Sequence, residues 1–311
     1  MHIVSYSRGE EVPISVGVLE GNYVVDIAQS ALSQSDNVFG TETVALIEVL
    51  RMGDAGMAAL RRIVATEPKV IHELSAVQLK APLPRPNTIR DFMLVEEHVK
   101  NSFGNVPEEW YKIPVHWKGN PDTVFGPNDE VPWPHYTDKL DYELEIAAVI
   151  NKPLFEATLE QALDAIVGYT IFNDWSARDI QVREMSVGIG PAFGKDFATS
   201  MGPSLVTADS IVITEAAMEA RINGEVWTKG GLGAMVFSFA QVLALLSYDQ
   251  PLNPGDIFGS GTIGRGCGLE LDRWIQPGDI LEIEVEGIGI LKNLVGQKKQ
   301  LPSNLIQLTG E

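Results

Sequence analysis

The sequence predicts a mainly β protein with some helix, in the α+β class. Its C-terminal part carries short apolar runs of strand length near residues 256–259, 280–286 and 288–294, and Pro-Gly-Asp turns precede two of them. Helical periodicity is confined to a few short segments. The chain has 311 residues, 45% hydrophobic and 21% charged, so it has an ordinary globular composition and can bury a large core.

The N-terminal region is expected to form a small accessory domain. Short strands are predicted within residues 2–26, with a turn at Gly21-Asn22, and helical patterns follow at roughly 42–51 and 55–65. Nothing before residue 76 gathers ionisable groups in a catalytic arrangement.

A proline-rich segment over residues 79–86 is typical of a stiff, extended connector. We therefore predict a domain boundary there. The accessory domain would comprise residues 1–80, and residues 81–311 would form a larger, β-rich catalytic domain.

Net charge and cysteine content limit the partners and the compartment. A net charge of −19 argues against binding to nucleic acid or an anionic membrane. The single cysteine, Cys267, allows no intrachain disulfide, which fits a reducing cytoplasm. We find no signal peptide and no apolar run of membrane-spanning length, so we expect a soluble, cytoplasmic protein.

The segment 140–150 reads as a strand that enters the core. Apolar residues alternate along one face from Leu144 to Ile150, so Glu143 and Glu145 emerge together on the other face. Two neighbouring carboxylates repel each other and are costly to desolvate, and a divalent cation between them would resolve both problems. The alternative is a half-exposed strand with a solvated face.

A second candidate pair lies just after the connector. If Asp91 opens a helix, His98 follows about two turns later on the same side. The alternative is an N-cap aspartate with a surface histidine. The irregular segment 104–137, rich in Pro, Gly, Trp and Tyr, is typical of a lid or pocket wall.

The remaining elements are predicted in order. A capping box at Thr158 opens a short helix, and a second core strand over 167–174 ends in Asp174. The glycine-rich segment 188–199 completes no phosphate-binding fingerprint. A hairpin turn is predicted at Asn223-Gly224, and a helix from about Ser238 to Leu246.

These positions define a candidate metal site. The potential ligands Asp91, Glu143, Glu145 and Asp174 are all hard oxygen donors, which favour Mg²⁺, Mn²⁺ or Ca²⁺ over zinc or copper. His98 could serve as a base because imidazole titrates near neutrality. Lys195 and Arg178 would supply the positive charge that an anionic substrate needs.

Five motifs in this order resemble those of the fumarylacetoacetate hydrolase family, over roughly residues 80–295. They are Asp91 with His98 seven residues later, Tyr142-Glu143-Leu144-Glu145, Asn173-Asp174-Trp175-Ser176-Ala177-Arg178-Asp179-Ile180-Gln181, Phe193-Gly194-Lys195-Asp196-Phe197-Ala198-Thr199, and Gly259-Ser260-Gly261-Thr262-Ile263. The resemblance implies a mixed β-sandwich roll with a small N-terminal α/β domain, a homodimer, and Mg²⁺- or Ca²⁺-dependent chemistry on a β-dicarbonyl acid in the breakdown of aromatic compounds.

The resemblance also implies roles for single residues. Asp91, Glu143, Glu145 and Asp174 match the metal ligands, and His98 matches the general base. Arg178, Gln181, Lys195 and Thr262 match residues that bind substrate or stabilise an oxyanion, and Trp117 aligns approximately with a pocket tyrosine. Glu270 matches the carboxylate that orients the histidine, although it could also be a surface glutamate. Members that lack this glutamate often carry one at the position of Asn101.

The pair of His98 and Glu270 favours the hydrolytic branch of the family. The implied reaction cleaves a carbon–carbon bond in an acylpyruvate or a fumarylacetoacetate-like acid, with His98 activating a water molecule and Lys195 stabilising the oxyanion. Met93 and Pro107 stand where fumarylacetoacetases carry a tyrosine and an arginine, so a more apolar acyl group is as plausible as a fumaryl group.

Two other functions stay open from the sequence. One is an isomerase, decarboxylase or hydratase of the same family that acts on a 2-oxo acid with the same metal. The other is a non-catalytic, metal-stabilised binding protein, which would have no need of a base and its orienting carboxylate.

Overall fold

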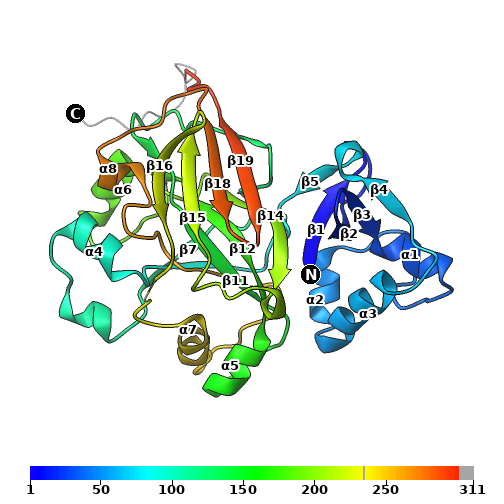
Figure 1. Cartoon of the computed structure of the whole chain (residues 1–311). Coiled ribbons are helices and arrows are strands. Elements are labelled where there is room, and N and C mark those ends of the chain that lie inside the picture. The colour runs from blue at the N-terminus through cyan, green and yellow to red at the C-terminus, as the bar shows by residue number, and fades with distance from the viewer. Residues whose placement is uncertain (234, 301–311) are drawn as a thin grey trace.

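The computed structural model of the chain describes residues 1–233 and 235–300 and is built on two large β-sheets that pack face to face (Figure 1). Strands make up 32% and helices 23% of the described residues, so the predicted α+β class is confirmed. Among the described residues, no helix combines the length and the apolar character that crossing a membrane requires.

The larger sheet has twelve strands. Its hydrogen-bonded path runs β4 (Ile71–Glu73), β3 (Tyr23–Asp26), β2 (Ser15–Glu20), β1 (His2–Ser7), β14 (Thr199–Thr207), β12 (Ile166–Asp174), β11 (Glu145–Ile150), β17 (Ile257–Gly259), β6 (Ile89–Phe92), β7 (His116–Gly119). Two further strands pair beside this path, β5 (Gln78–Lys80) with β1 and β8 (Val124–Phe125) with β14.

The smaller sheet has five strands, in the order β16 (Glu225–Gly230), β15 (Met218–Ile222), β18 (Ile280–Val285), β19 (Gly289–Val295), β9 (Glu130–Val131). A separate two-stranded ribbon joins β10 (Leu140–Asp141) to β13 (Ser176–Ala177). In the chain, β10 precedes β11 and β13 follows β12, and both β11 and β12 carry candidate site residues.

The helices are short and lie outside the two sheets (Figure 1). They are α1 (Ile27–Ser33), α2 (Leu46–Arg51), α3 (Asp54–Val64), α4 (Glu96–Phe103), α5 (Leu159–Ala165), α6 (Arg178–Met185), α7 (Phe239–Leu246) and α8 (Gly268–Leu271), with 3₁₀ turns at Leu74–Ala76, Glu108–Tyr111 and Ala208–Ser210.

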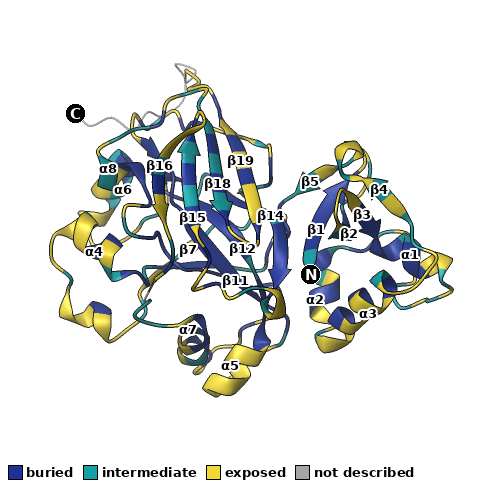
Figure 2. Cartoon of the chain, viewed as in Figure 1, coloured by how far each residue is buried: buried dark blue, intermediate teal, exposed yellow. Residues whose placement is uncertain are grey.

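The main core lies between the two sheets. Ile146 of β11 and Ile171 of β12 pack against Met218 and Ile283 of the smaller sheet. The opposite face of β11, with Ala147 and Val149, is also buried, so this strand is covered on both sides (Figure 2). Any charged group on β11 is therefore held away from water.

The larger sheet runs across the predicted domain boundary. Ile3 of β1 pairs with Leu205 of β14, and one apolar cluster joins residues of the N-terminal strands and helices to residues of β11, β12 and β14. The division into residues 1–80 and 81–311 stays a prediction, and residues 301–311 lie outside the described residues.

Several local predictions agree with the structure. The Asn223-Gly224 turn joins β15 to β16 with both residues at positive φ, 52° and 80°, as a two-residue hairpin of the I′ type requires. Thr158 caps α5, and Gln161 completes the capping box. β12 ends at Asp174, as expected.

Two local predictions were wrong. Asp91 does not open a helix; it lies in β6, between Gly259 of β17 and Trp117 of β7, and helix α4 begins only at Glu96. The segment 140–150 is not one continuous strand. It breaks after Asp141, where the backbone turns to bridge Glu143 to Cys267, and resumes at Glu145.

The segment 104–137 is more ordered than its composition indicates. It contains a 3₁₀ turn and the strands β7, β8 and β9. Val115, His116 and Trp117 of this segment do line a pocket, as expected for a pocket wall.

Candidate active site

A cavity of about 350 Å³ lies beside the end of the larger sheet that β6 and β7 form. Its walls come from β6, β7, α4, α6 and α8 and from the turn after β17. The charged lining residues are buried, whereas several apolar ones, including Phe103, Val182 and Met185, are exposed at its rim. The cavity therefore has a charged floor and an apolar mouth.

The floor is a cluster of buried carboxylates. Asp91, Glu143 and Asp174 offer carboxylate oxygens that lie within 4.8 Å of one another. Glu145 lies beside them, completely buried, and accepts a hydrogen bond from Thr262 Oγ1 at 3.1 Å. The four predicted ligands thus come together from β6, β11, β12 and the break between β10 and β11.

Burial and mutual repulsion shift the ionisation of this cluster. Burial, together with the neighbouring carboxylates, raises the pKa of Glu145 and of Asp174 well above the usual range. Burial also raises the pKa of Asp91. For Glu143 burial acts in the same direction, but Lys195 and Arg178 outweigh it and hold its pKa well below the usual range.

The cluster fits a divalent cation. Oδ1 of Asp91, Oε2 of Glu145 and Oδ1 of Asp174 are buried oxygens without a hydrogen-bond partner among the described residues. Such atoms are costly unless they are satisfied by another ligand. Hard carboxylate oxygens converging on one point are the donor set that Mg²⁺, Mn²⁺ and Ca²⁺ prefer.

Lys195 lies against the same carboxylates. Its Nζ donates to Glu143 Oε2 at 2.6 Å and to Asp174 Oδ2, and it lies 5.7 Å from the ring centroid of Trp117. Burial alone would lower its pKa, but Asp174 and Glu143 outweigh this effect and raise it. Lys195 is therefore a fixed positive charge on the cavity wall.

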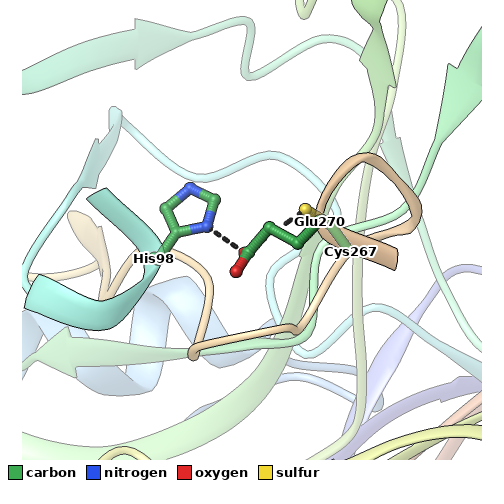
Figure 3. A group of neighbouring side chains, drawn as sticks. All are labelled: His98, Cys267 and Glu270. Atoms are coloured by element: carbon green, nitrogen blue, oxygen red, sulfur yellow. Dashed lines mark hydrogen bonds and ion pairs between the residues drawn. The ribbon is translucent and has the colours of Figure 1, made fainter. Parts of the chain in front are cut away.

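His98 and Glu270 form the predicted pair. His98 Nδ1 lies 2.5 Å from Glu270 Oε1, and Figure 3 shows the ring from α4 facing the carboxylate from α8. The ionised carboxylate accepts a hydrogen bond from Nδ1–H, which leaves the lone pair of Nε2 free to act as the base. His98 lines the cavity that the carboxylate cluster also lines.

Three further donors hold Glu270. Asn101 Nδ2 and the backbone N–H of Arg265 each donate to Oε2 at 2.7 Å, and the thiol of Cys267 lies 3.5 Å from Oε1 (Figure 3). Burial alone would raise the pKa of Glu270, but its hydrogen bonds, with that from His98 the largest, hold the pKa below its ordinary value. The carboxylate therefore stays ionised beside the imidazole.

Cys267 completes a second possible metal-ligand group with His98 and Glu270. However, burial raises the pKa of the Cys267 thiol well above its usual range, so the thiol stays protonated. A protonated thiol is a poor metal ligand and a weak hydrogen-bond donor. In its contact with Glu270, the Cys267 thiol is therefore a weak hydrogen-bond donor.

The residues expected to bind substrate also line the cavity, but they hold the carboxylates as well. Arg178 donates to Glu143 Oε1 at 2.8 Å and to Gln181 Oε1 at 3.1 Å. Trp117 Nε1 donates to Asp91 Oδ2 at 3.1 Å, and Thr262 contacts Glu145 as described above. Met93 lines the cavity, whereas Pro107 begins the 3₁₀ turn at Glu108–Tyr111.

Sequence reasoning missed one buried charged residue next to the site. Asp141 is completely buried and contacts both Arg178 and the start of α8. Its place two residues before Glu143 was a usable signal, because alternation along the single strand predicted over 140–150 would put residues 141, 143 and 145 on one face.

Comparisons with known proteins place the chain in a family. The family model described as "Fumarylacetoacetate (FAA) hydrolase C-terminal" matches residues 87–296. The oxaloacetate tautomerase YisK of Bacillus subtilis (strain 168) is 32% identical over 297 residues, which cover 90% of this chain and 95% of that relative.

Solved structures agree in fold. A probable 2-hydroxyhepta-2,4-diene-1,7-dioate isomerase from Mycobacterium abscessus superposes with a TM-score of 0.74 at 27% identity and covers 96% of this chain and 100% of its own. A maleylpyruvate hydrolase from Sphingobium sp. SYK-6, solved with manganese(II) and pyruvate, has a TM-score of 0.72 at 22% identity, with coverage of 96% and 100%. The chain therefore belongs to the fumarylacetoacetate hydrolase family and has its fold.

Proposed function

We propose that this chain is a divalent-metal-dependent enzyme that interconverts the keto and enol forms of a 2-oxo acid. One observation carries the proposal: the His98–Glu270 pair and the buried carboxylate cluster line the same cavity. The relative that matches 90% of the chain is named for this kind of reaction, which supports the choice.

Asp91, Glu143, Glu145 and Asp174 would hold the cation. Mg²⁺ is our first choice and Mn²⁺ or Ca²⁺ would also suit these ligands; the manganese in the maleylpyruvate hydrolase structure supports a divalent ion. When bound, the cation supplies Lewis-acid polarisation of the 2-oxo group.

His98 would move the proton. Its basic Nε2 takes the proton from the carbon next to the 2-oxo group, and the same nitrogen can return a proton to oxygen, so that atoms and charge balance overall. Glu270 fixes the tautomer and stabilises the imidazolium that forms in between.

Lys195 would stabilise the enolate oxygen. Its buried ammonium is held in place by Glu143 and Asp174, so it needs no rearrangement when negative charge develops in the substrate. Arg178, Gln181, Thr262 and Trp117 line the cavity and would orient the anionic substrate.

Hydrolysis of a carbon–carbon bond in an acylpyruvate or a fumarylacetoacetate-like acid is the second candidate. The apolar mouth favours it, because Phe103, Val182, Met185 and Leu269 offer room for an acyl group that a four-carbon diacid would leave unfilled. In that reaction His98 would take a proton from water instead of from carbon, and one water molecule would be consumed.

Product analysis separates the two reactions. Purified protein with Mg²⁺ or Mn²⁺ is mixed with enol oxaloacetate and, separately, with a set of acylpyruvates, and the products are followed by NMR. Loss of the enol with conservation of mass would support tautomerisation, and formation of two acids from an acylpyruvate would support hydrolysis. If neither substrate class reacts, both candidates fail. Samples treated with a chelator and the His98→Ala variant are the controls.

We also propose that the chain forms a homodimer and that residues 1–80 form an accessory unit. The first proposal comes from the likeness to the family, and the second from the proline-rich connector at residues 79–86. Light scattering coupled to size-exclusion chromatography tests the first, and limited proteolysis near residue 80 tests the second.

A further inference from the structure

Asp141 contacts both the helix that carries Glu270 and the arginine that holds Glu143, but it does not line the cavity. It is completely buried at the end of β10, where it pairs with Ser176 of β13. A buried carboxylate is costly unless every oxygen is satisfied. The hydrogen-bond partners of Asp141 therefore indicate its role in the structure.

On one side, Asp141 holds the turn that carries Glu270. Its Oδ1 accepts the backbone N–H of Gly268 at 2.7 Å, and its Oδ2 accepts that of Leu269 at 3.0 Å. These two residues begin α8, and Glu270 follows them directly. The backbone approaches this closely because residue 268 is glycine: a Cβ there would lie 2.6 Å from Asp141 Oδ1 and 2.2 Å from Arg273 O.

On the other side, Asp141 holds the arginine that fixes a candidate metal ligand. Oδ2 of Asp141 accepts a hydrogen bond from Nε–H of Arg178 at 2.9 Å, and Nη2 of the same guanidinium donates to Glu143 Oε1 at 2.8 Å. Arg178 is buried, and its planar fork fixes the direction of both bonds. Movement of Asp141 would therefore move Glu143.

We infer that Asp141 is a positioning residue that sets the placement of the His98–Glu270 pair relative to the metal-binding carboxylates. One carboxylate joins the helix turn of Glu270 to the guanidinium that holds Glu143, and the backbone bridge between Glu143 and Cys267 runs beside it. The inference rests on the proposed function, since it assigns Asp141 to the same site.

Asp141→Asn tests this inference at nearly constant volume. An amide offers one accepting oxygen in place of two, so its NH₂ group must face either a backbone N–H or the guanidinium, donor against donor. We expect the dissociation constant for Mn²⁺, measured by titration calorimetry without substrate, to rise about 10-fold or more. We also expect faster hydrogen exchange at the amides of Gly268 and Leu269, and a lower kcat at saturating metal with a smaller change in KM.

Asp26→Asn is the matched control. Asp26 is also a buried aspartate that caps a helix, accepting the backbone N–H of Gln29 and the hydroxyl of Tyr6, but it lies in the N-terminal region and does not line the cavity. The Asp26→Asn substitution should lower the midpoint temperature of unfolding without changing the Mn²⁺ affinity or kcat.

The outcomes are distinct. If Asp141→Asn behaves like Asp26→Asn, with Mn²⁺ affinity and kcat within twofold of wild type, Asp141 is only structural and the inference is overturned. If the wild-type protein itself binds no divalent cation, the proposed function fails, and the inference fails with it. Should Asp141→Asn not fold, Arg178→Lys, which breaks the same link to Glu143, must weaken Mn²⁺ binding; unchanged affinity would overturn the inference.

Discussion

The side-chain amide of Asn101 donates a 2.7 Å hydrogen bond to Oε2 of Glu270, the carboxylate oxygen that His98 does not contact. Asn101 and His98 are three residues apart on α4, so one helix face holds both oxygens of Glu270. The carboxylate is thereby prevented from rotating away from the imidazole.

Asn101→Ala removes this second hold and should lower kcat about 3- to 10-fold, because a hydrogen bond to a charged group contributes roughly 1.5 kcal/mol and Asn101 is exposed to water. Steady-state kinetics on the enol substrate measures the effect. Asn105→Ala, an exposed asparagine just beyond the same helix, is the control and should be neutral. Wild-type turnover in Asn101→Ala would mean that Glu270 is held without it.

His98→Ala should lower kcat about 10²- to 10⁴-fold, the usual contribution of a positioned general base. The Mn²⁺ dissociation constant should stay within about threefold of wild type, because His98 is not one of the clustered carboxylates. His135→Ala, an exposed histidine outside the cavity, is the control. Turnover near the wild-type rate in His98→Ala would remove the base from the mechanism.

Glu145→Gln should weaken metal binding yet stabilise the metal-free protein. Burial and three neighbouring carboxylates raise the pKa of Glu145, so its charge is costly in the fold without a cation. We expect a rise of Tm in chelator and a loss of the Tm increase that Mn²⁺ gives the wild type. Differential scanning calorimetry with and without Mn²⁺ measures both. The exposed Glu42→Gln is the control, and a lower Tm of Glu145→Gln in chelator would contradict the prediction.

Glu270 should contribute stability that depends on pH. Its folded-state pKa lies below the ordinary value of 4.5, so the unfolded chain takes up the proton first as pH falls. The contribution is therefore fully present above about pH 4.5–5 and is lost as pH falls through the folded-state pKa. The stability difference between wild type and Glu270→Gln in urea should be larger at pH 7 than at pH 4. A difference that is independent of pH would show that the charge of Glu270 does not stabilise the fold.

Much of the fold follows from local signals in the chain. The Asn223-Gly224 hairpin and the capping box of Thr158 with Gln161 depend only on residues within a few positions of each other, and both formed where predicted. The placement of Asp174 at the end of a buried strand followed from the apolar run before it. Such signals involve residues that are close in the chain, so they can be recognised from the sequence alone.

The parts that sequence reasoning missed depend on partners that are distant in the chain. Asp91 becomes a strand residue because β17, more than 160 residues later, pairs with it in parallel. The break between β10 and β11 depends on a bridge from Glu143 to Cys267. The role of Asp141 becomes visible only through its hydrogen bonds with Arg178 and Gly268, which are distant in the chain. No periodicity within one segment can report these contacts.

The pairing of β1 with β14 has a consequence for any shortened form of the protein. A chain that begins at residue 81 would lose β1 and leave the backbone of β14 near Leu205 and Val206 without its neighbour. An uncovered strand of this kind invites pairing with another copy and then aggregation. The six-residue strand β1 thus shields β14 from pairing with another copy of the chain, whatever chemistry the cavity performs.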